Sequence, residues 1–582
     1  MKSLSYLNKY FFKYKWHVLL GVVFIIASNY FAVQMPMFVQ NTVNELFEKT
    51  DLKSFLDFFT LMLKIGGFYM FLAFMKGFFL FLQRQSIIIM SRLIEYDLKN
   101  EVYDQYQKLD YSFFKKNNTG DLMNRITEDV SQVRMYLGPG IMYTINLVIL
   151  FIMVVSQMIQ INGKLTFFVL LPLPLMSFLI YKVSSKMNKL SHEVQKEQSN
   201  MSTLIQEFFS GIRVIKAYSR ENEVKEKFNN SANEYHTRNM KKVFVNAMFM
   251  PTITFLIGLS TLIVIYVGGF MTYNNSISLG EIISFIMFVN MLTWPFASVG
   301  WVTSIIQSAA VSQERINEFL REKPEIKNEN NSDFQFQGTI EFKNVSYTYP
   351  NSNIEAVHNL SFKINKGDTF AVIGRTGSGK SSIINLLMRQ FDPTLGEIFI
   401  DGINLKEVNL DYFRKQTGVV PQDVFLFSDT IANNIKFGSN EETVSIDELI
   451  LITKKAHVYQ NIDAFLDKFE TLLGERGVNL SGGQKQRVSI ARALIRKPSL
   501  LILDDCLSAV DTETEEIILA NLKNETSLKT SVIVSHRIST IRNASKIIVI
   551  ENGCKVEEGS HAELINLKGT YSEIYAKQLK ES

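Results

Sequence analysis

The most chemically informative stretch of the sequence is a glycine-rich segment, Gly374 to Ser381, which fits the pattern G-x-x-x-x-G-K-[ST]. A β-branched run, Thr369 to Ile373, precedes it and predicts a strand, whereas the apolar run Ser382 to Met388 predicts a helix. Between a strand and a helix, such glycines let backbone N–H groups approach a phosphate, and the helix N-terminus adds partial positive charge. We therefore predict a phosphate-binding loop in which Lys380 contacts the β- and γ-phosphates of a nucleotide and Ser381 suits Mg²⁺. The predicted nucleotide-binding residues are Gly374, Arg375, Thr376, Gly377, Ser378, Gly379, Lys380, Ser381 and Ser382.

Two consecutive carboxylates follow a second apolar run. Leu500 to Leu503 predicts a buried parallel strand, and Asp504 at its end can hold Mg²⁺ beside the phosphate-binding loop. Asp505 could polarise the water that attacks the γ-phosphate. The alternative reading of Asp505 is a helix-capping or structural residue, because Asp is a common cap.

Three further residues are candidates for the same site. Gln422 follows a β-like run and could touch Mg²⁺ or the attacking water. His536 follows the β-like run Ser531 to Val534 and could contact the γ-phosphate or orient water. Tyr349 could stack on a base. Taken singly, each residue is more often structural than functional.

A second anion site is predicted at Leu480 to Gln484, where Ser481, Gly482, Gly483 and Gln484 begin a helix that runs through Arg492. Backbone N–H groups and the helix dipole favour an anion at such a start. The alternative is an ordinary glycine turn with a serine cap. Two phosphate sites in one domain make sense if the second serves a nucleotide on another copy of the domain.

The composition indicates a membrane part joined to a soluble part. The 582 residues are 47% hydrophobic and 20% charged, with a net charge of +4. This charge is too small to indicate nucleic-acid binding, and basic residues beside membrane segments explain it more simply. The two cysteines, Cys506 and Cys554, make neither a disulfide framework nor a zinc set.

Six apolar stretches in the first half are close to the length that spans a bilayer as a helix. The fourth is short and contains two prolines, and the second carries Lys64 and Lys76, which are costly inside a membrane. The simpler explanations are snorkelling near a helix end, which suits Lys64, or a span that begins later than residue 58. The predicted spans are residues 17–39, 58–82, 135–161, 165–181, 243–273 and 282–306.

Long charged connections alternate with short ones. Lysines near the long connections, together with the basic N-terminus, place these connections and the C-terminal half on the cytoplasmic side. Within them, residues 84–109 and 185–206 keep helical spacing and predict helices that continue beyond the membrane. Each connection contains a break followed by a predicted short tip helix, Asp121 to Val130 in the first and Ile212 to Glu221 in the second.

The pattern of the chain changes after the sixth span. We predict an α-helical transmembrane domain at 1–321, a polar linker at 322–337, and an α/β P-loop ATPase domain at 338–582 with a mostly parallel core. The predicted strands include residues 340–342, 369–373, 500–503, 531–534 and 546–550.

Together these motifs resemble an ATP-binding cassette exporter of the kind with six membrane helices fused to one nucleotide-binding domain. The resemblance covers essentially the whole chain, including the cytoplasmic loop segments 119–122 and 211–217 and the exporter-type loop 471–477. The family's motifs correspond to Walker A at Gly374–Ser381, the Q-loop Gln422, the signature Leu480–Gln484, Walker B at Leu500–Asp504, the D-loop Ser508–Asp511 and the switch His536.

The resemblance implies a dimer of two halves that holds two ATP molecules with Mg²⁺ between its cassettes. Each ATP would contact Walker A of one half and the signature of the other, which explains the second anion site. Tyr349 would stack on adenine, and Ser381, Gln422 and Asp504 would hold Mg²⁺. ATP binding would close the cassettes and turn the membrane cavity outward, and hydrolysis would reset it.

One residue departs from the family pattern, which usually has Glu directly after the Walker B Asp. Here that residue is Asp505, whose carboxylate is one methylene shorter. Misplacement on the order of 1 Å can cost about 10²-fold in rate. The chain therefore resembles one subunit of the bacterial heterodimeric multidrug exporters, with a degenerate site of its own and a signature that completes the competent site of a partner bearing Glu. The alternative is a homodimer in which Asp505 suffices.

The predicted activity is ATP hydrolysis coupled to export of hydrophobic or amphipathic compounds, multidrug or lipid-like, across the bacterial cytoplasmic membrane. Met and aromatic residues in the sixth span could line a cavity for such cargo, although packing explains any single one of them more simply. A peptide exporter is the second hypothesis, and the lack of a protease-like domain before the first span counts against its processing type. An ATP-gated sensor or channel is the third.

Overall fold

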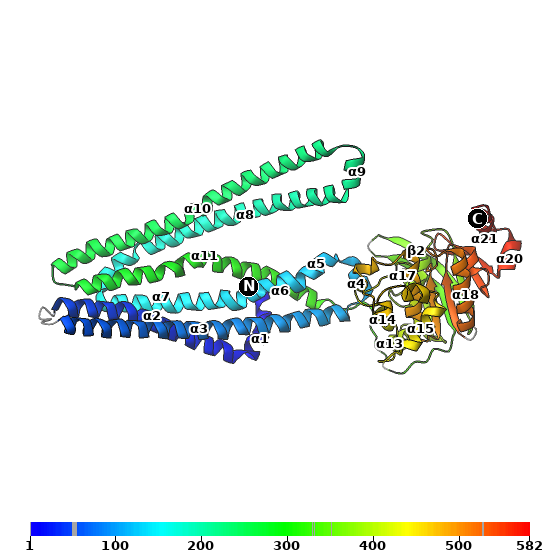
Figure 1. Cartoon of the computed structure of the whole chain (residues 1–582), viewed down its shortest axis with the longest axis horizontal. Coiled ribbons are helices and arrows are strands. Elements are labelled where there is room, and N and C mark those ends of the chain that lie inside the picture. Colours follow the sequence, from blue (N-terminus) through cyan, green and yellow to red (C-terminus); the bar gives the residue numbers. More distant parts are fainter. Residues whose placement is uncertain are drawn as a thin grey trace. The chain divides into compact units, whose positions relative to one another are not determined.

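The computed structural model describes residues 2–48, 55–328, 330, 332–350, 352–526 and 529–581. The chain forms two compact units, each made of two segments (Figure 1). The helical unit comprises Met1–Gln107 and Thr119–Glu322. The mixed unit comprises Lys108–Asn118 and Lys323–Ser582, so that a short piece of the first long connection folds with the C-terminal half.

The helical unit is built from long helices, and among its described residues five helices are long and apolar enough to cross a membrane. These five cover Lys15–Phe47, Phe59–Lys108, Thr119–Leu170, Glu221–Tyr273 and Leu279–Arg321. The bounds of the elements are η1 Lys2–Leu7, α1 Asn8–Lys13, α2 Lys15–Glu48, α3 Phe55–Lys108, α5 Thr119–Asn124, η2 Arg125–Asp129, α6 Val130–Met135, η3 Tyr136–Gly140, α7 Ile141–Leu170, α8 Pro172–Ser210, α9 Ile212–Ala217, α10 Glu221–Tyr273 and α11 Leu279–Arg321.

The predicted turn between the third and fourth spans lies inside α7. Asn162 has non-helical backbone angles, φ −158° and ψ 108°, and its side-chain oxygen accepts a hydrogen bond from the backbone N–H of Leu165 at 3.0 Å. Asn162 thus caps a new helical segment, as Asn favours at a helix start. The predicted fourth span covers this segment and the beginning of α8. Because α8 is not among the five helices above, that span remains a prediction.

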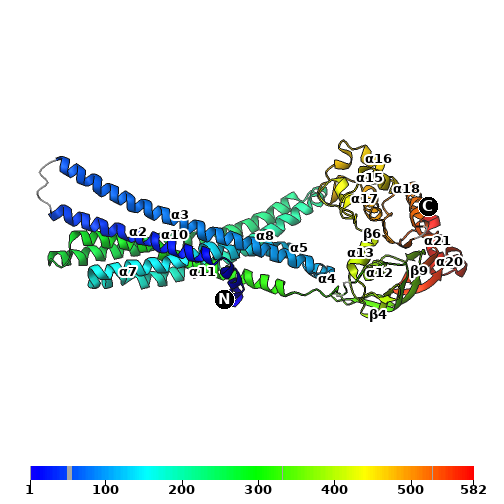
Figure 2. The ribbon, with the colours of Figure 1, turned by 90° about the horizontal axis from the view of Figure 1, so that it is seen from below.

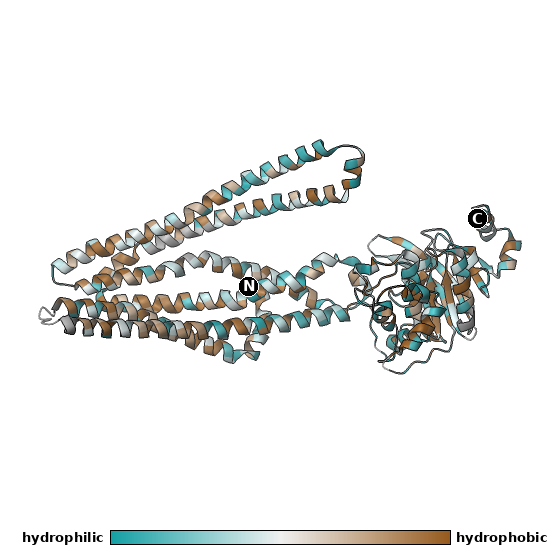
Figure 3. Ribbon diagram, in the orientation of Figure 1, coloured by the Kyte–Doolittle hydropathy of each residue, from teal (hydrophilic) through white to brown (hydrophobic). Residues whose placement is uncertain are grey.

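The long helices continue beyond their apolar parts, as the sequence predicts. Helices α8 and α10 run side by side and are joined by α9 (Figures 1 and 2). Their ends near α9 are predominantly hydrophilic, whereas the opposite ends are predominantly hydrophobic (Figure 3). The second predicted tip helix is confirmed in α9, which begins at Ile212 as predicted but ends at Ala217 rather than at Glu221.

The prediction of the first tip helix was wrong. The short helix of this connection is α4, Tyr111–Lys116, which precedes the break rather than following it. Asp110 caps α4 by accepting a hydrogen bond from the backbone N–H of Phe113 at 3.3 Å. Residues 121–130 instead belong to α5, η2 and α6, the helical segments that lead back toward α7. A six-residue helix is too short to show a clear apolar period, which explains the error.

The mixed unit contains a largely parallel sheet with the order β10-β9-β3-β8-β7-β6 and a four-stranded antiparallel sheet with the order β2-β1-β4-β5. In the first sheet, β9, β3, β8, β7 and β6 are parallel, which confirms the predicted parallel core. The strands are β1 Ile340–Tyr349, β2 Ile354–Ile364, β3 Thr369–Ile373, β4 Leu395–Ile400, β5 Ile403–Asn404, β6 Thr417–Val420, β7 Leu500–Asp504, β8 Thr530–Val534, β9 Lys546–Glu551 and β10 Cys554–Gly559.

Helices cover both faces of this sheet and complete two buried apolar clusters, one on each side of it. The helices of the mixed unit are α4 Tyr111–Lys116, α12 Lys380–Leu387, α13 Leu410–Lys415, α14 Ile431–Lys436, α15 Ile446–Lys455, α16 Tyr459–Asp463, η4 Lys468–Glu470, η5 Glu475–Gly477, α17 Gly482–Leu494, α18 Thr512–Thr526, α19 Ile538–Ile541, α20 His561–Leu567 and α21 Thr570–Glu581.

Candidate nucleotide site

The register of the parallel strands brings the predicted catalytic residues to one edge of the sheet. Val372 lies opposite Val534, and Leu503 lies opposite both Ile533 and Val420. The strands β3, β8, β7 and β6 therefore end together. The phosphate-binding loop, His536, Asp505 and Gln422 each follow one of these ends, at the edge where open α/β sheets bind ligands.

The phosphate-binding loop folds as predicted between β3 and α12, and it requires glycine at Gly379. The backbone of Gly379 has a φ of +99°, and a Cβ there would lie 2.0 Å from the carbonyl oxygen of Ala356. The ammonium of Lys380 is buried and folds back over the loop, where it donates to the carbonyls of Gly374 at 2.9 Å and Arg375 at 2.8 Å. Burial lowers the pKa of Lys380 to about 8, against the opposing effect of Asp505 and Asp504. When a nucleotide binds, this buried ammonium can exchange its carbonyl partners for phosphate oxygens.

Asp504 and Ser381 present the oxygen atoms that Mg²⁺ prefers. The hydroxyl of Ser381 donates to Oδ1 of Asp504 at 3.4 Å, and Asp504 is buried. Burial raises the pKa of Asp504 to about 6, although the hydrogen bond from Ser381 opposes this shift. A buried carboxylate of this kind is stabilised in its charged form by a cation. Proteins usually bind Mg²⁺ through one or two carboxylates and the phosphates of the substrate, so these residues fit the ion.

Asp505 is held against the loop that follows β8. Its backbone N–H donates to the carbonyl of Val534 at 2.8 Å, and its own φ is +44°, a conformation that is uncommon for residues other than glycine. Its carboxylate accepts a hydrogen bond from the backbone N–H of His536 at 3.4 Å. Burial and the nearby Lys380 ammonium lower the pKa of His536, so the imidazole is neutral at pH 7.

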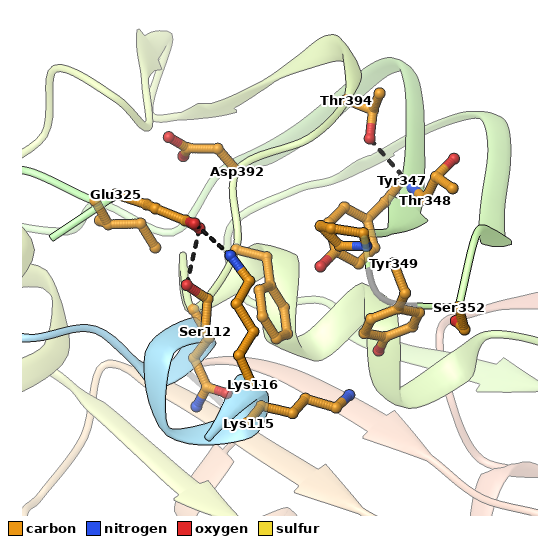
Figure 4. A pocket seen from close by; sticks show the side chains of 14 residues that line it. Ser112, Lys115, Lys116, Glu325, Tyr347, Thr348, Tyr349, Ser352, Asp392 and Thr394 are labelled. Carbon is orange, nitrogen blue, oxygen red and sulfur yellow. Dashed lines mark hydrogen bonds and ion pairs between the residues drawn. The ribbon is translucent and has the colours of Figure 1, made fainter. Parts of the chain in front are cut away.

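Tyr349 lies at the end of β1 beside a cavity of about 430 Å³ (Figure 4). Its hydroxyl is 3.0 Å from that of Ser382, which is the third residue of α12. Its ring packs edge-on against Tyr347 and Phe391. The ammonium of Lys115, from α4, lies 4.1 Å from the centroid of the Tyr349 ring. The structure thus places Tyr349 next to the phosphate-binding helix, where a base could reach it.

The signature segment forms a capped helix start. Ser481 accepts a hydrogen bond from the backbone N–H of Gln484 at 3.3 Å, and the side chain of Gln484 accepts one from the backbone N–H of Ser481 at 2.9 Å. A Cβ at Gly483 would lie 2.9 Å from the carbonyl of Ala509, so the D-loop packs closely on this start. Within the described parts of the chain, no hydrogen bond joins 481–484 to the phosphate-binding loop. Ser481 is exposed and available to another molecule.

Two residues that support His536 could not be identified from the sequence. Gln578 of α21 donates to the carbonyl of His536 at 2.6 Å and accepts from the backbone N–H of Ile538 at 2.9 Å. Arg537 donates to the carbonyl of Ser508 at 2.9 Å, which ties the histidine loop to the D-loop. Only the position of Arg537 next to His536 offered a signal, whereas Gln578 lies 42 residues away in the chain.

Comparison with known proteins decides the family. Residues 18–296 match the family model described as the ABC transporter transmembrane region, and residues 357–508 match the one described as ABC transporter. The chain belongs to the ABC transporter family. It is 34% identical over 572 residues to the probable multidrug resistance ABC transporter ATP-binding/permease protein YheI of Bacillus subtilis, covering 98% of this chain and 96% of that protein.

Two further relatives and one solved structure are also similar to this transporter. It is 35% identical to the multidrug resistance-like ATP-binding protein MdlA of Escherichia coli, over 84% of this chain and 82% of that protein. It is 30% identical to the ATP-dependent lipid A-core flippase of Thiobacillus denitrificans, over 87% of each chain. A bacterial Atm1-family ABC exporter with ATP bound shares the fold, with a TM-score of 0.81 and 24% identity over 97% of this chain and 99% of that one.

These findings confirm the main prediction from the sequence. The transporter is a membrane protein that joins a helical transmembrane domain to an ATP-binding ATPase domain in one chain, and its ATP hydrolysis is coupled to export. Exporters of this family work as dimers.

Proposed function

We propose that this chain is one half of a heterodimeric exporter and that its own nucleotide site binds ATP and Mg²⁺ but hydrolyses ATP slowly. The observation that carries the proposal is the position of Asp505. Its short carboxylate is engaged by the backbone N–H of His536 at 3.4 Å and lies on a backbone of positive φ. A Glu at the same position would extend one methylene farther from the backbone toward the γ-phosphate side.

The residues of this site have distinct roles in the proposal. Backbone N–H groups of the phosphate-binding loop and Lys380 bind the phosphates, whereas Ser381, Asp504 and Gln422 would hold Mg²⁺. Mg²⁺ held there would neutralise charge that develops on the phosphate oxygens. The imidazole of His536 is neutral, and its backbone N–H donates to the carboxylate of Asp505 at 3.4 Å. In the proposal, His536 positions the γ-phosphate. The shorter carboxylate of Asp505 falls short of the attacking water and accepts its proton inefficiently, at a cost on the order of 10²-fold.

In contrast to the hydrolytic residues of its own site, the signature of this chain is intact, because its helix start is capped and exposed. Ser481, Gly482, Gly483 and Gln484 therefore complete the nucleotide site of the partner, which we propose to be a different chain with Glu after its Walker B Asp. The dimer then contains one slow and one competent site.

Steady-state ATP hydrolysis by this chain purified alone in lipid tests the proposal. The wild type is expected to be nearly inactive, whereas Asp505→Glu raises turnover on the order of 10²-fold. Asp505→Asn supplies the background without any carboxylate. An ordinary exporter rate for the wild type alone would show that Asp505 is an adequate base and that a homodimer suffices.

The proposed cargo is a hydrophobic or amphipathic compound, in line with the multidrug and lipid names of the relatives. We place the N-terminus and the ATPase domain on the cytoplasmic side of the cell membrane, because the basic residues of the chain gather at the ends of the long connections. Inside-out vesicles that carry this chain and its partner are expected to take up an amphipathic cationic dye when ATP is added. Lys380→Ala in this chain, combined with the matching change in the partner, should abolish uptake.

A further inference from the structure

We propose that a groove at the start of the first span is a binding site for a single anionic phospholipid, with an acyl chain in the groove and the phosphate at Lys15. The groove measures about 680 Å³ and lies in the helical unit. Its apolar walls are Phe11 and Phe12 from α1 and Val18, Leu19, Val22 and Val23 from α2.

The groove is fixed in place by polar contacts on the other side of the N-terminal segment. Glu101 of α3 binds the ammonium of Lys9 at 2.7 Å and accepts a hydrogen bond from the hydroxyl of Tyr10 at 2.5 Å. Asp97, one turn earlier on α3, binds the ammonium of Lys13 at 2.6 Å. These contacts pin α1 against α3 and leave its other face, with Phe12 77% exposed, directed away from the protein.

The cations of this segment differ in what they bind. Lys9 and Lys13 are neutralised by Glu101 and Asp97. Lys15 lines the groove, is exposed, and has no ion pair with any residue in the described part of the chain. Its ammonium lies 5.9 Å from the ring centroid of Trp16, which is itself 66% exposed. An apolar groove that has one unpaired cation in its lining matches an acyl chain below a negatively charged headgroup.

The position of the groove along the chain supports a lipid rather than a soluble ligand. Lys15 is the first residue of the first membrane-crossing helix, so the groove begins where the span begins. Trp side chains gather at membrane–water interfaces, and Lys side chains extend from there to the headgroups. Anionic lipids attract such lysines with an energy that corresponds to about a five-fold preference for each lysine.

Quenching of Trp16 fluorescence by brominated lipids tests this inference. The double variant Trp294→Phe with Trp301→Phe leaves Trp16 as the single Trp. It is used in vesicles that contain the brominated lipid in both leaflets, so the orientation of the protein does not matter. Trp16 quenching is measured with brominated phosphatidylglycerol in phosphatidylcholine and with brominated phosphatidylcholine in phosphatidylglycerol. The relative affinities obtained from the two series are expected to favour phosphatidylglycerol about five-fold. Lys15→Gln should remove this preference, and Lys15→Arg should retain it.

A matched control removes a different lysine from the same segment. The double variant Lys13→Gln with Asp97→Asn deletes an ion pair without changing the net charge and should leave the preference intact. Equal quenching by the two brominated lipids in the otherwise unmodified single-Trp protein would overturn the inference, because it describes ordinary surrounding lipid. Absence of quenching by either lipid would also overturn it and would indicate that protein covers the groove. ATP hydrolysis measured on the same samples reports separately on the proposed function.

Discussion

The ammonium of Lys115 lies 4.1 Å from the centroid of the Tyr349 ring, so a residue of the first long connection covers the aromatic ring that we propose to stack on adenine (Figure 4). The neighbouring Lys116 instead binds the carboxylate of Glu325, which also accepts a hydrogen bond from Ser112 at 2.8 Å. Two lysines of helix α4 thus contact different partners in the rest of the mixed unit.

This difference predicts distinct effects of two matched substitutions. A cation–π contact at an exposed site is worth about 0.5–1 kcal/mol, and adenine must displace the ammonium if it stacks on the same face of the ring. Lys115→Met should therefore tighten ATP binding by about two- to five-fold, measured with a fluorescent ATP analogue and competition by ATP. Lys116→Met removes the same charge from the same helix and should leave the affinity unchanged. Weaker binding in Lys115→Met would show that the ammonium helps to hold the nucleotide.

The contact between Lys116 and Glu325 predicts a dependence on pH. The hydrogen bonds from Lys116 and Ser112 lower the pKa of Glu325 in the folded protein. A lowered carboxyl pKa contributes stability that is present above the unfolded value of about 4.3 and is lost as the pH falls through the folded value. The amides of α4 should exchange hydrogen faster at pH 4 than at pH 6 once intrinsic rates are corrected. Glu325→Gln should reduce this difference, and the remainder comes from Asp110, which caps α4 and whose pKa is also lowered, despite burial, by hydrogen bonds to it. An unchanged pH response in that variant would place the titrating group elsewhere.

Gln578 predicts a positioning role for the C-terminal helix α21. Gln578 holds the carbonyl of His536 and the N–H of Ile538, so its loss should shift the histidine loop. In the Asp505→Glu variant of this chain, whose own site is expected to turn over, we expect Gln578→Ala to reduce kcat about ten-fold with little change in the KM for ATP, since small misplacements at the reacting centre are costly. Lys580→Ala, at an exposed position of the same helix, is the control. A parallel fall in thermal stability and in both constants would indicate a purely structural role.

Gly379 predicts a strict steric requirement in the phosphate-binding loop. Any side chain there meets the carbonyl of Ala356 and must adopt a φ of +99°. Gly379→Ala should abolish ATP binding measured by equilibrium dialysis. Gly402→Ala is the matched control, because Gly402 has a φ of +81° with open space around its Cβ position and should cost about 1–2 kcal/mol of stability without affecting ATP. ATP binding by Gly379→Ala at wild-type strength would show that the loop can rearrange.

Much of the fold and of the site could be predicted because the signals are local. The strand Thr369–Ile373 agrees with β3 at both ends, and the phosphate-binding loop needs only its own glycines and flanking elements. Parallel strands that end in chemistry-bearing residues bring Asp504, Asp505 and His536 together through sheet register alone.

Other features depend on contacts between distant parts of the chain and could not be predicted. Lys115 and Tyr349 are separated by more than two hundred residues, and α4 has too few residues to show an apolar period. Gln578 supports His536 from the last helix, where it resembles any exposed amide in the sequence. The sequence also could not predict that Lys9 and Lys13 are paired whereas Lys15 is not, because this difference depends on the positions of Glu101 and Asp97 on α3.

The central claim concerns chemistry at one site, so the most direct measurement is the fate of ATP bound there. This chain is purified in lipid, loaded with radiolabelled ATP and Mg²⁺, and separated from free nucleotide, and the retained nucleotide is analysed over time for the wild type and for Asp505→Glu. The account predicts that the wild type retains ATP while Asp505→Glu converts it to ADP on the order of 10²-fold faster. Equal and rapid conversion in both proteins would contradict it.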